Sequence, residues 1–157
     1  MLEKITTINE ELLSLLKDDP VRPEIPADFR VDEHGKVYVL KDEENRPLAV
    51  TCVKFLADIP KNVDDLASLA VNSTTAVFYT IWSYAAGAGR ELITQAQADI
   101  KQSQPEVETF VTLSPKTEMA RKFHHKNGAM TYRENEDSVN YMYCLLYTSD
   151  AADDTPC

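Results

Sequence analysis

The sequence predicts an α+β domain in which a mostly antiparallel sheet has a strand–helix–strand–helix unit at its centre. Runs rich in β-branched and aromatic residues, typical of strands, recur along most of the chain. Two of these runs, Thr75–Trp82 and Glu106–Leu113, are each followed by a segment with the apolar spacing of a helix. With 157 residues, of which 43% are hydrophobic and 27% charged, the chain is long enough for one domain with its own core.

The N-terminal segment predicts one helix followed by an extended connector. Thr7 and Glu10 have the spacing of a capping box, in which the threonine caps the helix. The helix is expected to bury one apolar stripe, made of Ile8, Leu12, Leu15 and Leu16. The connector that follows contains three residues that disfavour regular structure, Pro20, Pro23 and Pro26.

The middle of the chain predicts a β-hairpin, a short helix and a central strand. The hairpin strands are residues 36–40 and 47–56, separated by the polar turn Asp42–Arg46. Apolar spacing at residues 63–70 predicts a short helix. The strand Thr75–Trp82 comes next.

The C-terminal part predicts a helix and then two strands. The helix covers residues 116–126 and stops at Asn127-Gly128, because glycine adopts the left-handed conformation without a Cβ penalty. Its buried stripe is expected to consist of Met119, Ala120 and Phe123. Strands at residues 129–133 and 139–143 complete the sheet.

Composition excludes several classes of protein. A net charge of −10 argues against nucleic-acid binding. No apolar run has the length of a membrane span, and the N-terminus lacks the basic-then-apolar pattern of a secretion signal. Before residue 144 the chain has one cysteine, Cys52, which forms no internal disulfide and is typical of a reducing compartment. We therefore expect a cytoplasmic protein that binds neither nucleic acid nor membranes.

The last residues differ in character from the rest. The segment Cys144–Asp154 resembles the translation of a transposon adapter used in sequencing libraries, which suggests a metagenomic origin. We expect residues 1–143 to form a single natural domain, and residues 144–157 to be an artefactual, disordered tail.

The turn Gly87-Ala88-Gly89-Arg90 lies between the strand Thr75–Trp82 and a helix that extends to about Gln102. A strand, Gly-x-Gly and a helix can bind phosphate, since backbone N–H groups and the helix dipole face the anion. Arg90 would add a charge-assisted contact. The third glycine of a dinucleotide motif and the lysine of a P-loop are missing, so a plain tight turn is an equally good interpretation. The position before a second strand–helix unit favours the pyrophosphate of coenzyme A, a plan similar to the acetyltransferase-like GNAT fold.

A hydroxyl and an imidazole flank the helix at 116–126. Ser114 precedes a proline, which is the common use of serine in a turn. His124 is next to His125, and a partly exposed helix histidine is its ordinary interpretation. Spacing alone favours these structural roles. The two histidines are neighbours and no cysteine or carboxylate completes a shell, so no metal site is predicted.

Several segments, in the same order, resemble the malonyl-CoA decarboxylase family. The similar segments are RPLAV through ADIP (46–60), TAVFYTI (75–81), GREL (89–92), TFVTLSP (109–115), FHHKNGA (123–129) and VNYMY (139–143). The combination of LSP with FH-x-x-NGA is specific to that family, whereas the glycine turn is not.

The resemblance implies a function and a site. Ser114 and His124 take the roles of the family's catalytic pair, and the coenzyme A contacts fall at the start of the helix, on Gly87, Ala88, Gly89, Arg90, Glu91 and Leu92. The implied reaction is decarboxylation of malonyl-CoA, or of malonyl-acyl carrier protein, to the acetyl thioester and CO₂. No cofactor is implied beyond the coenzyme A or phosphopantetheine moiety of the substrate.

The chain departs from the family pattern in ways that bear on its assembly. One helix precedes the first predicted strand, where the family has a helical domain, and nine residues separate Ser114 from His124, where the family has a helical insertion. Thr80 stands where the family often has serine. These differences are compatible with a homo-oligomer. A version of the family as short as this one would suit a viral gene in a bacterial host.

Decarboxylation leaves an enolate, which needs hydrogen-bond donors and a proton. We expect His124 to deliver or relay the proton, and Ser114 to hydrogen-bond the carboxylate or accept a proton within the pair. Backbone N–H groups at Thr80–Trp82 would polarise the thioester carbonyl. Because His124 lies about 12 Å along a helix that begins near Lys116, the substrate is expected to lie between the two side chains.

Two alternatives come from other classes, an N-acetyltransferase of the same fold and a non-catalytic acyl-CoA-binding module. Acetyltransferases usually have Gln or Arg at the position of Tyr84, often a glutamate on the central strand, and a tyrosine at the position of His124. All three are absent, so this function ranks second. The basic stretch 116–133 predicts either solvated helix charges or a landing surface for coenzyme A phosphates or an acidic carrier protein.

Overall fold

The computed structural model describes residues 1–68 and 72–143. Its centre is a seven-stranded sheet with the order β1-β2-β3-β4-β5-β7-β6. The strands are β1 (Leu2–Ile5), β2 (Gly35–Lys41), β3 (Pro47–Leu56), β4 (Thr75–Ser83), β5 (Thr109–Thr112), β6 (Ala129–Glu134) and β7 (Val139–Tyr143). The helices are α1 (Glu10–Leu16), α2 (Ala27–Arg30), the 3-10 helix η1 (Val63–Ala67), α3 (Ala88–Ser103) and α4 (Glu118–Lys126). Every neighbouring pair in this sheet is antiparallel except β4 and β5.

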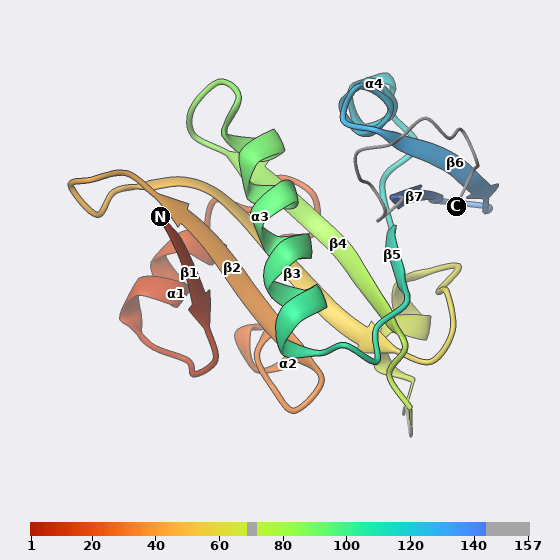
Figure 1. Ribbon diagram of the computed structural model, residues 1–157, viewed down its shortest axis with the longest axis horizontal. Coiled ribbons are helices and arrows are strands. Elements are labelled where there is room, and N and C mark those ends of the chain that lie inside the picture. Colours follow the sequence, from red (N-terminus) through yellow and green to blue (C-terminus); the bar gives the residue numbers. More distant parts are fainter. Residues whose placement is uncertain (69–71, 144–157) are drawn as a thin grey trace.

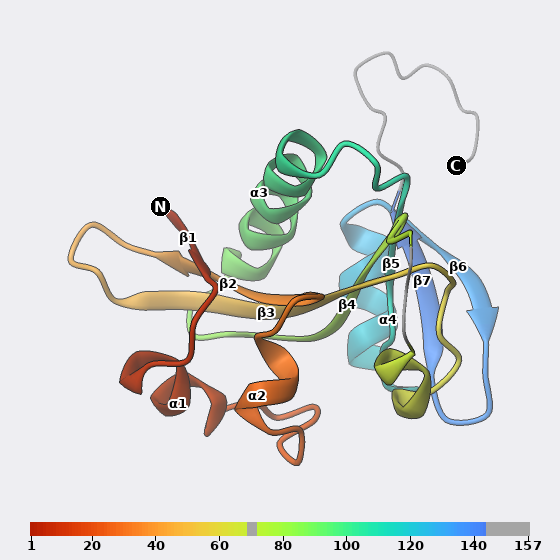
Figure 2. The same cartoon turned by 90° about the horizontal axis from the view of Figure 1, so that it is seen from below.

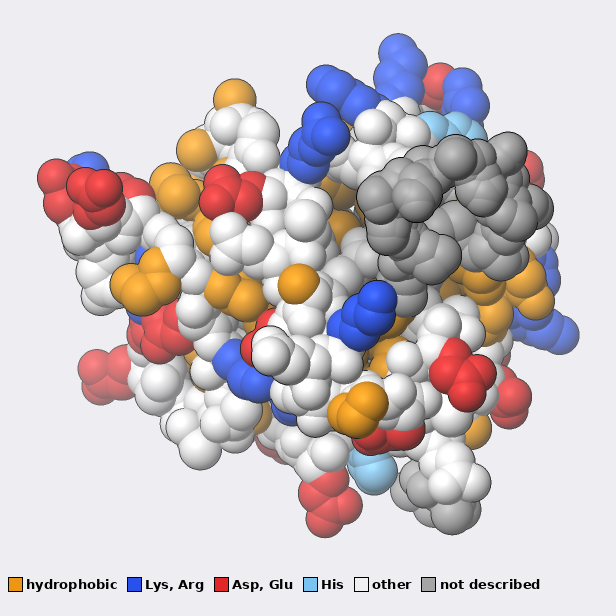
Figure 3. Space-filling model, viewed as in Figure 1, with side chains coloured by type: hydrophobic (Ala, Val, Ile, Leu, Met, Phe, Trp, Pro, Cys, Tyr) orange, Lys and Arg blue, Asp and Glu red, His pale blue; other side chains and the backbone are white. Residues whose placement is uncertain are grey.

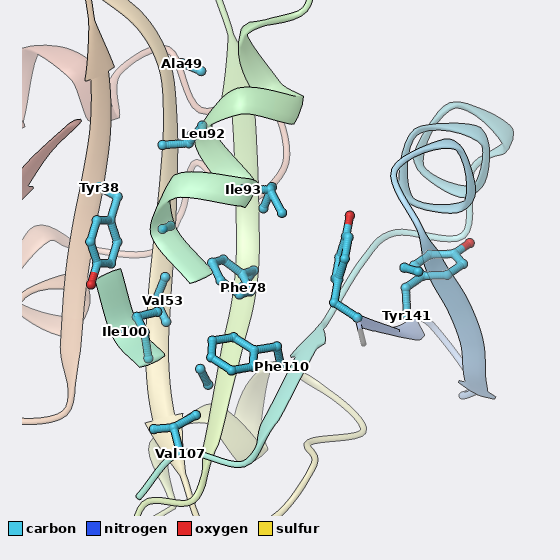
Figure 4. Packing of buried hydrophobic residues seen from close by; sticks show 14 of the residues in the cluster. Tyr38, Ala49, Val53, Phe78, Leu92, Ile93, Ile100, Val107, Phe110 and Tyr141 are labelled. Carbon is cyan, nitrogen blue, oxygen red and sulfur yellow. The ribbon is translucent and has the colours of Figure 1, made fainter. Parts of the chain in front are cut away.

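Helices cover both faces of the sheet. Figures 1 and 2 show α3 lying across one face, with α1 and α2 on the other. The alternation of side chains along a strand builds two cores, since successive residues point to opposite faces. Phe78 and Phe110 face α3, where Ile93 and Ile100 pack in the same cluster (Figure 4). A second cluster of buried residues lies on the α1 and α2 side, including Leu12, Val77, Tyr79, Val111 and Leu113.

The parallel pair β4 and β5 separates before β4 ends. The two strands pair from Thr75 with Thr109 to Phe78 with Thr112. Beyond Phe78, β4 continues to Ser83 paired with β3, which is on its other side. The register of β3 against β4 shifts so that Tyr79 is an extra, unpaired residue, and such a bulge increases the local bend. The divergence of β4 from β5 leaves an opening in the middle of the sheet.

Most of the predicted elements are confirmed, including the hairpin, the central strand–helix–strand–helix unit and the last two strands. The capping box was wrong: Asn9 caps α1 and accepts a hydrogen bond from the Leu12 backbone N–H at 2.8 Å, so the helix starts at Glu10. Ile8, expected in the apolar stripe, is 47% exposed. Two observed elements, β1 and α2, were not predicted from the sequence.

The predicted buried stripe of α4 needs correction as well. Met119 is 81% exposed, Ala120 and Phe123 are half-buried, and His124 is the buried residue of this helix. The cap prediction at its end is confirmed, because Asn127 is the C-cap. The predictions for residues 69–70 and for the tail 144–157 concern positions outside the described residues. No helix within residues 1–68 and 72–143 is both long and apolar enough to cross a membrane.

Candidate active site

A cavity of about 490 Å³ lies where β4 and β5 diverge. It is bounded by β4, the segment of residues 113–115 that follows β5, the first turn of α3, helix α4 and the loop that follows α1. The lining residues that bear on its chemistry are Tyr79, Thr80, Gly89, Ser114, Phe123 and His124. No Lys, Arg, Asp or Glu lines it among the residues that the structure describes. Ser114 and His124 therefore share one cavity without formal charge on its walls.

Ser114 is held at the end of β5 by backbone and side-chain bonds. It forms a two-bond bridge with Val139 of β7, both N–H···O distances being 2.9 Å. Its Oγ lies 2.8 Å from Oγ1 of Thr112, and that oxygen also accepts from the backbone N–H of Tyr141 at 3.1 Å. Ser114 and Thr112 are 5% and 1% exposed. The serine hydroxyl is thus oriented within a short chain of buried hydrogen bonds.

His124 is held against β7. Its Nδ1 lies 2.7 Å from the hydroxyl of Tyr143, and its ring stacks on Tyr141 with centroids 5.1 Å apart. The two tyrosines are two positions apart on one strand, so they share a face of the sheet. That shared face gives His124 a buried aromatic wall, and only 3% of the residue is exposed.

Burial sets the charge of this histidine. It lowers the pKa of His124 to about 4, with a smaller contribution from the neighbouring His125, so the ring is neutral at pH 7. Burial also raises the pKa of Tyr143, which keeps the phenol protonated. A phenol that donates to Nδ1 leaves the proton of the neutral ring on Nε2.

The second nitrogen of His124, Nε2, has no hydrogen-bond partner among the residues that the structure describes. His124 is one of the residues that line the cavity. Nε2 is therefore the ring nitrogen that is free to bind a ligand. It can act there as a hydrogen-bond donor.

A buried ion pair supports the β4 side of the cavity. Asp19 and Arg30 approach to 2.7 Å with both side chains fully buried. Oδ1 of Asp19 accepts from the hydroxyl of Thr80, at 2.8 Å, and Thr80 lines the cavity. Removing one partner of a buried ion pair strongly destabilises a protein, so Asp19 is held firmly in place. The hydrogen bond to Asp19 in turn fixes the side chain of Thr80.

The first turn of α3 meets α4 at the mouth of the cavity. Gly87, the N-cap, has φ 79°, a left-handed conformation that glycine adopts without strain. A Cβ on Gly89 would lie 3.0 Å from the Phe123 ring, so the absence of a side chain allows the two helices to approach closely. A larger residue at position 89 would require the Phe123 ring to move by a few tenths of an ångström.

Comparison with known families adds to this geometry. Residues 39–151 match the model of the malonyl-CoA decarboxylase C-terminal domain. The chain belongs to the malonyl-CoA decarboxylase family. The match is wider at both ends than the segments quoted from the sequence, and it extends beyond Tyr143. A comparison with curated protein sequences finds no match.

Solved structures agree with the family and with the GNAT-like α+β fold. Malonyl-CoA decarboxylase from Agrobacterium vitis is 25% identical, with a TM-score of 0.65, over 78% of this chain and 35% of that one. The enzyme from Rhodopseudomonas palustris is 22% identical, with a TM-score of 0.75, over 92% and 60%. An acetyltransferase from Bacillus subtilis in complex with CoA is 15% identical, with a TM-score of 0.66, over 92% and 98%. The chain thus spans 60% or less of these decarboxylases.

Within this family member, the two residues of the predicted catalytic pair meet at one cavity, but no hydrogen bond joins them. Ser114 is bonded to Thr112 and His124 to Tyr143. Of the six residues predicted to contact coenzyme A, Gly89 lines the cavity. Gly87, Arg90 and Glu91 are exposed in or before the first turn of α3, whereas Ala88 and Leu92 are buried in the core. The side chain of Leu92 packs in the hydrophobic core.

Sequence reasoning missed the partners of the two side chains. The period-2 pattern Val139, Tyr141, Tyr143 could have indicated that both tyrosines lie on one face of the last strand. Thr112 stands two positions before Ser114, on the same face of an extended segment, which is a signal of the same kind. The contact between Asp19 and Thr80 had no local signal, since 61 positions separate the two residues.

Proposed function

We propose that this chain decarboxylates malonyl-CoA to acetyl-CoA and CO₂. Its family supports this reaction, although it spans 60% or less of the decarboxylase chains it matches. The observation that carries the proposal is the cavity at Ser114 and His124, which has no charged side chain among its described lining residues. A malonyl carboxylate in such a site loses hydration without gaining a counter-ion, whereas the transition state spreads its charge as CO₂ leaves.

The chemistry follows from the two neutral side chains. The bond between the carboxylate carbon and the α-carbon breaks, its electron pair enters the thioester enolate, and one proton from solvent converts the α-carbon to the methyl group. The Ser114 hydroxyl turns its one hydrogen from Thr112 Oγ1 to a carboxylate oxygen, and so holds the carboxylate in an orientation in which this bond can break. His124 Nε2 donates to the enolate and relays the proton. The low pKa of His124 makes its protonated form scarce at pH 7 but strongly acidic once formed.

The coenzyme A arm would run from the cavity to the first turn of α3. Helix α3 has sixteen residues and begins at Ala88, after the N-cap Gly87, so its dipole and the N–H groups of its first turn favour an anion there. Arg90 is exposed in that first turn and would contact the pyrophosphate. Backbone N–H groups of β4 beyond Phe78, where β5 no longer pairs, would polarise the thioester carbonyl.

A second candidate substrate is malonyl-acyl carrier protein, which presents the same phosphopantetheine arm. Basic side chains gather over α4 (Figure 3), and the exposed ones in this helix and just before it are Lys116, Arg121, Lys122 and Lys126. Carrier proteins are acidic, so such a surface would steer their approach. Exchanging Lys122 and Lys126 for Glu would weaken use of the carrier-protein substrate and leave malonyl-CoA turnover nearly unchanged if this candidate is correct. Equal effects on both substrates would indicate coenzyme A phosphates instead.

The proposal is tested by incubating the protein with malonyl-CoA labelled with ¹³C at the carboxylate, with and without an amine acceptor. We expect labelled CO₂ and unacetylated amine, whereas an N-acetyltransferase would acetylate the amine from acetyl-CoA. Replacing His124 or Ser114 by Ala should lower kcat about 10²- to 10⁴-fold while CoA still binds. If the wild-type protein binds CoA but releases no CO₂, the result would instead support the non-catalytic acyl-CoA-binding module. Full turnover by His124→Ala would remove this residue from the mechanism.

A further inference from the structure

Arg22 bridges β4 and β5 at the point where they separate. Its Nε donates to the carbonyl of Tyr79 at 3.0 Å, and its Nη2 donates to the carbonyl of Leu113 at 2.9 Å. The last direct bond between these segments is one step earlier, from Leu113 N–H to the Phe78 carbonyl at 3.1 Å. The guanidinium therefore replaces the sheet bonds at the apex of the opening.

The backbone of Arg22 is fixed independently of its side chain. Its N–H donates to Oδ1 of Asp19 at 3.0 Å, and its carbonyl accepts from Nη2 of Arg30 at 2.7 Å. Asp19 and Arg30 form the buried ion pair beneath the cavity. Replacing the Arg22 side chain would therefore leave the loop anchored by both of these bonds.

The two carbonyls that Arg22 binds belong to peptide groups that form the cavity wall. The Tyr79 carbonyl shares its peptide plane with the N–H of Thr80, and the Leu113 carbonyl shares its plane with the N–H of Ser114. All four of these residues line the cavity. One rigid, planar donor thus sets the separation between the backbone of β4 and the backbone that carries Ser114.

We propose that Arg22 is a positioning residue that fixes Ser114 relative to β4, and thereby keeps open the space in which the acyl thioester lies. The inference rests on the proposed function for the identity of that ligand. Without the bridge, the bond from Leu113 N–H to the Phe78 carbonyl is the last one to β4, and Ser114 is held from the β7 side through Val139. The distance between Ser114 and Thr80 across the opening is then less tightly constrained. A shift of about 1 Å at a reacting group is enough to cost about 10²-fold in rate.

The test uses Arg22→Met, which keeps the length and apolar stem but removes both hydrogen bonds. The matched control is Arg46→Met in the exposed β2–β3 turn. We expect Arg22→Met to lower kcat/KM for CO₂ release roughly 10- to 100-fold, since two hydrogen bonds from a charged donor are lost. It should also raise the Kd of CoA several-fold, measured by calorimetry. The control should change either quantity less than twofold.

A chemical rescue experiment distinguishes the loss of the Arg22 hydrogen bonds from a general loss of stability. Arg22→Ala should recover at least part of the lost activity in ethylguanidinium chloride, but not in the same concentration of ethylammonium chloride, because only the planar fork spans two carbonyls. Wild-type kcat/KM and Kd in a folded Arg22→Met protein would overturn the proposal. If Arg22→Met does not fold, Arg22→Lys is measured in its place. A wild-type kcat/KM in Arg22→Lys would equally overturn the proposal. If the wild-type protein binds CoA but releases no CO₂, the proposed function fails while the Kd comparison still tests Arg22.

Discussion

The buried, neutral state of His124 predicts how the stability of the protein depends on pH. The pKa of this group falls from 6.5 in the unfolded chain to about 4 in the folded protein. The unfolded state therefore binds more protons between these two pH values, and the free energy of unfolding rises with pH across that window. This part of the stability is fully present above about pH 6.5 and is lost as the pH falls toward 4.

The size of the effect follows from the same two values. The difference between them corresponds to about 3 kcal/mol when the window is crossed completely, of which about 2 kcal/mol is lost between pH 7 and pH 4.5. Five described carboxylates also have lowered pKa values, Asp19, Asp32, Asp42, Asp99 and Glu118. Their ordinary values, 3.8 for the aspartates and 4.5 for Glu118, place most of their effect at or below the acid end of the window. The window above pH 4.5 therefore reports mainly on the histidine.

The perturbation is His124→Gln, which keeps a polar group near Tyr143 but removes the titration. Urea unfolding would be followed between pH 4.5 and 7.5 by the fluorescence of Trp82, the single tryptophan, which is 7% exposed. We expect the variant to be less stable than wild type at pH 7 and to lose about 2 kcal/mol less on acidification. The control His34→Gln, in the turn before β2, should keep the wild-type slope. Parallel slopes for wild type and His124→Gln would show that the histidine is not held neutral by burial.

Three further substitutions test other parts of the site. Thr112→Val removes the partner of the Ser114 hydroxyl and should lower kcat about tenfold with little change in KM, as measured by CO₂ release. Gly87→Ala forces a Cβ into a conformation with φ 79° and should destabilise the fold by about 1 kcal/mol in urea unfolding. Arg30→Met leaves its fully buried carboxylate partner unpaired and should cost about 3–5 kcal/mol, which would appear as a lowered Tm.

Two of these substitutions have a conservative counterpart at the same position, and the third has a control at an exposed arginine. Thr112→Ser retains the hydroxyl and should restore kcat; a Val variant with wild-type kcat would exclude an orienting role for Thr112. Gly87→Asn should be milder than Gly87→Ala, because asparagine tolerates the left-handed region better. Arg46→Met removes an exposed arginine and should change stability by no more than about 0.5 kcal/mol. A loss as small as this in Arg30→Met would contradict the importance of the buried pair.

The apolar patterns along the chain were enough to predict every strand of the sheet except β1. The hairpin of β2 and β3 and the paired units β4–α3 and β5–α4 each have a periodic apolar pattern that spans the whole element, so local sequence determines their type. β1 has only four residues, Leu-Glu-Lys-Ile, which is too short to show a period. The cap of α1 was misplaced because Thr7 and Asn9 are both good caps, and the choice between them depends on backbone geometry that the residue types do not specify.

The candidate site was predicted in part for a similar reason. The serine at the end of β5 and the histidine on α4 stand in recognisable local contexts, whereas their partners come from elsewhere in the chain. The apolar stripe predicted for α4 was wrong because Met119 was assigned to the core on its hydrophobicity alone. In the structure, Tyr141 and Tyr143 form an aromatic wall that buries His124 instead. Arg22 reaches a carbonyl 91 positions away, a contact that no local pattern indicates.

The order of the strands has a consequence for biosynthesis. β7 is inserted between β5 and β6, although it follows both along the chain. It supplies the backbone that secures Ser114 and the phenol that orients His124. A nascent polypeptide that has emerged only as far as β6 therefore holds both side chains without the strand that arranges them. Ser114 and His124 reach their observed positions only after β7 has been synthesised and has paired between β5 and β6.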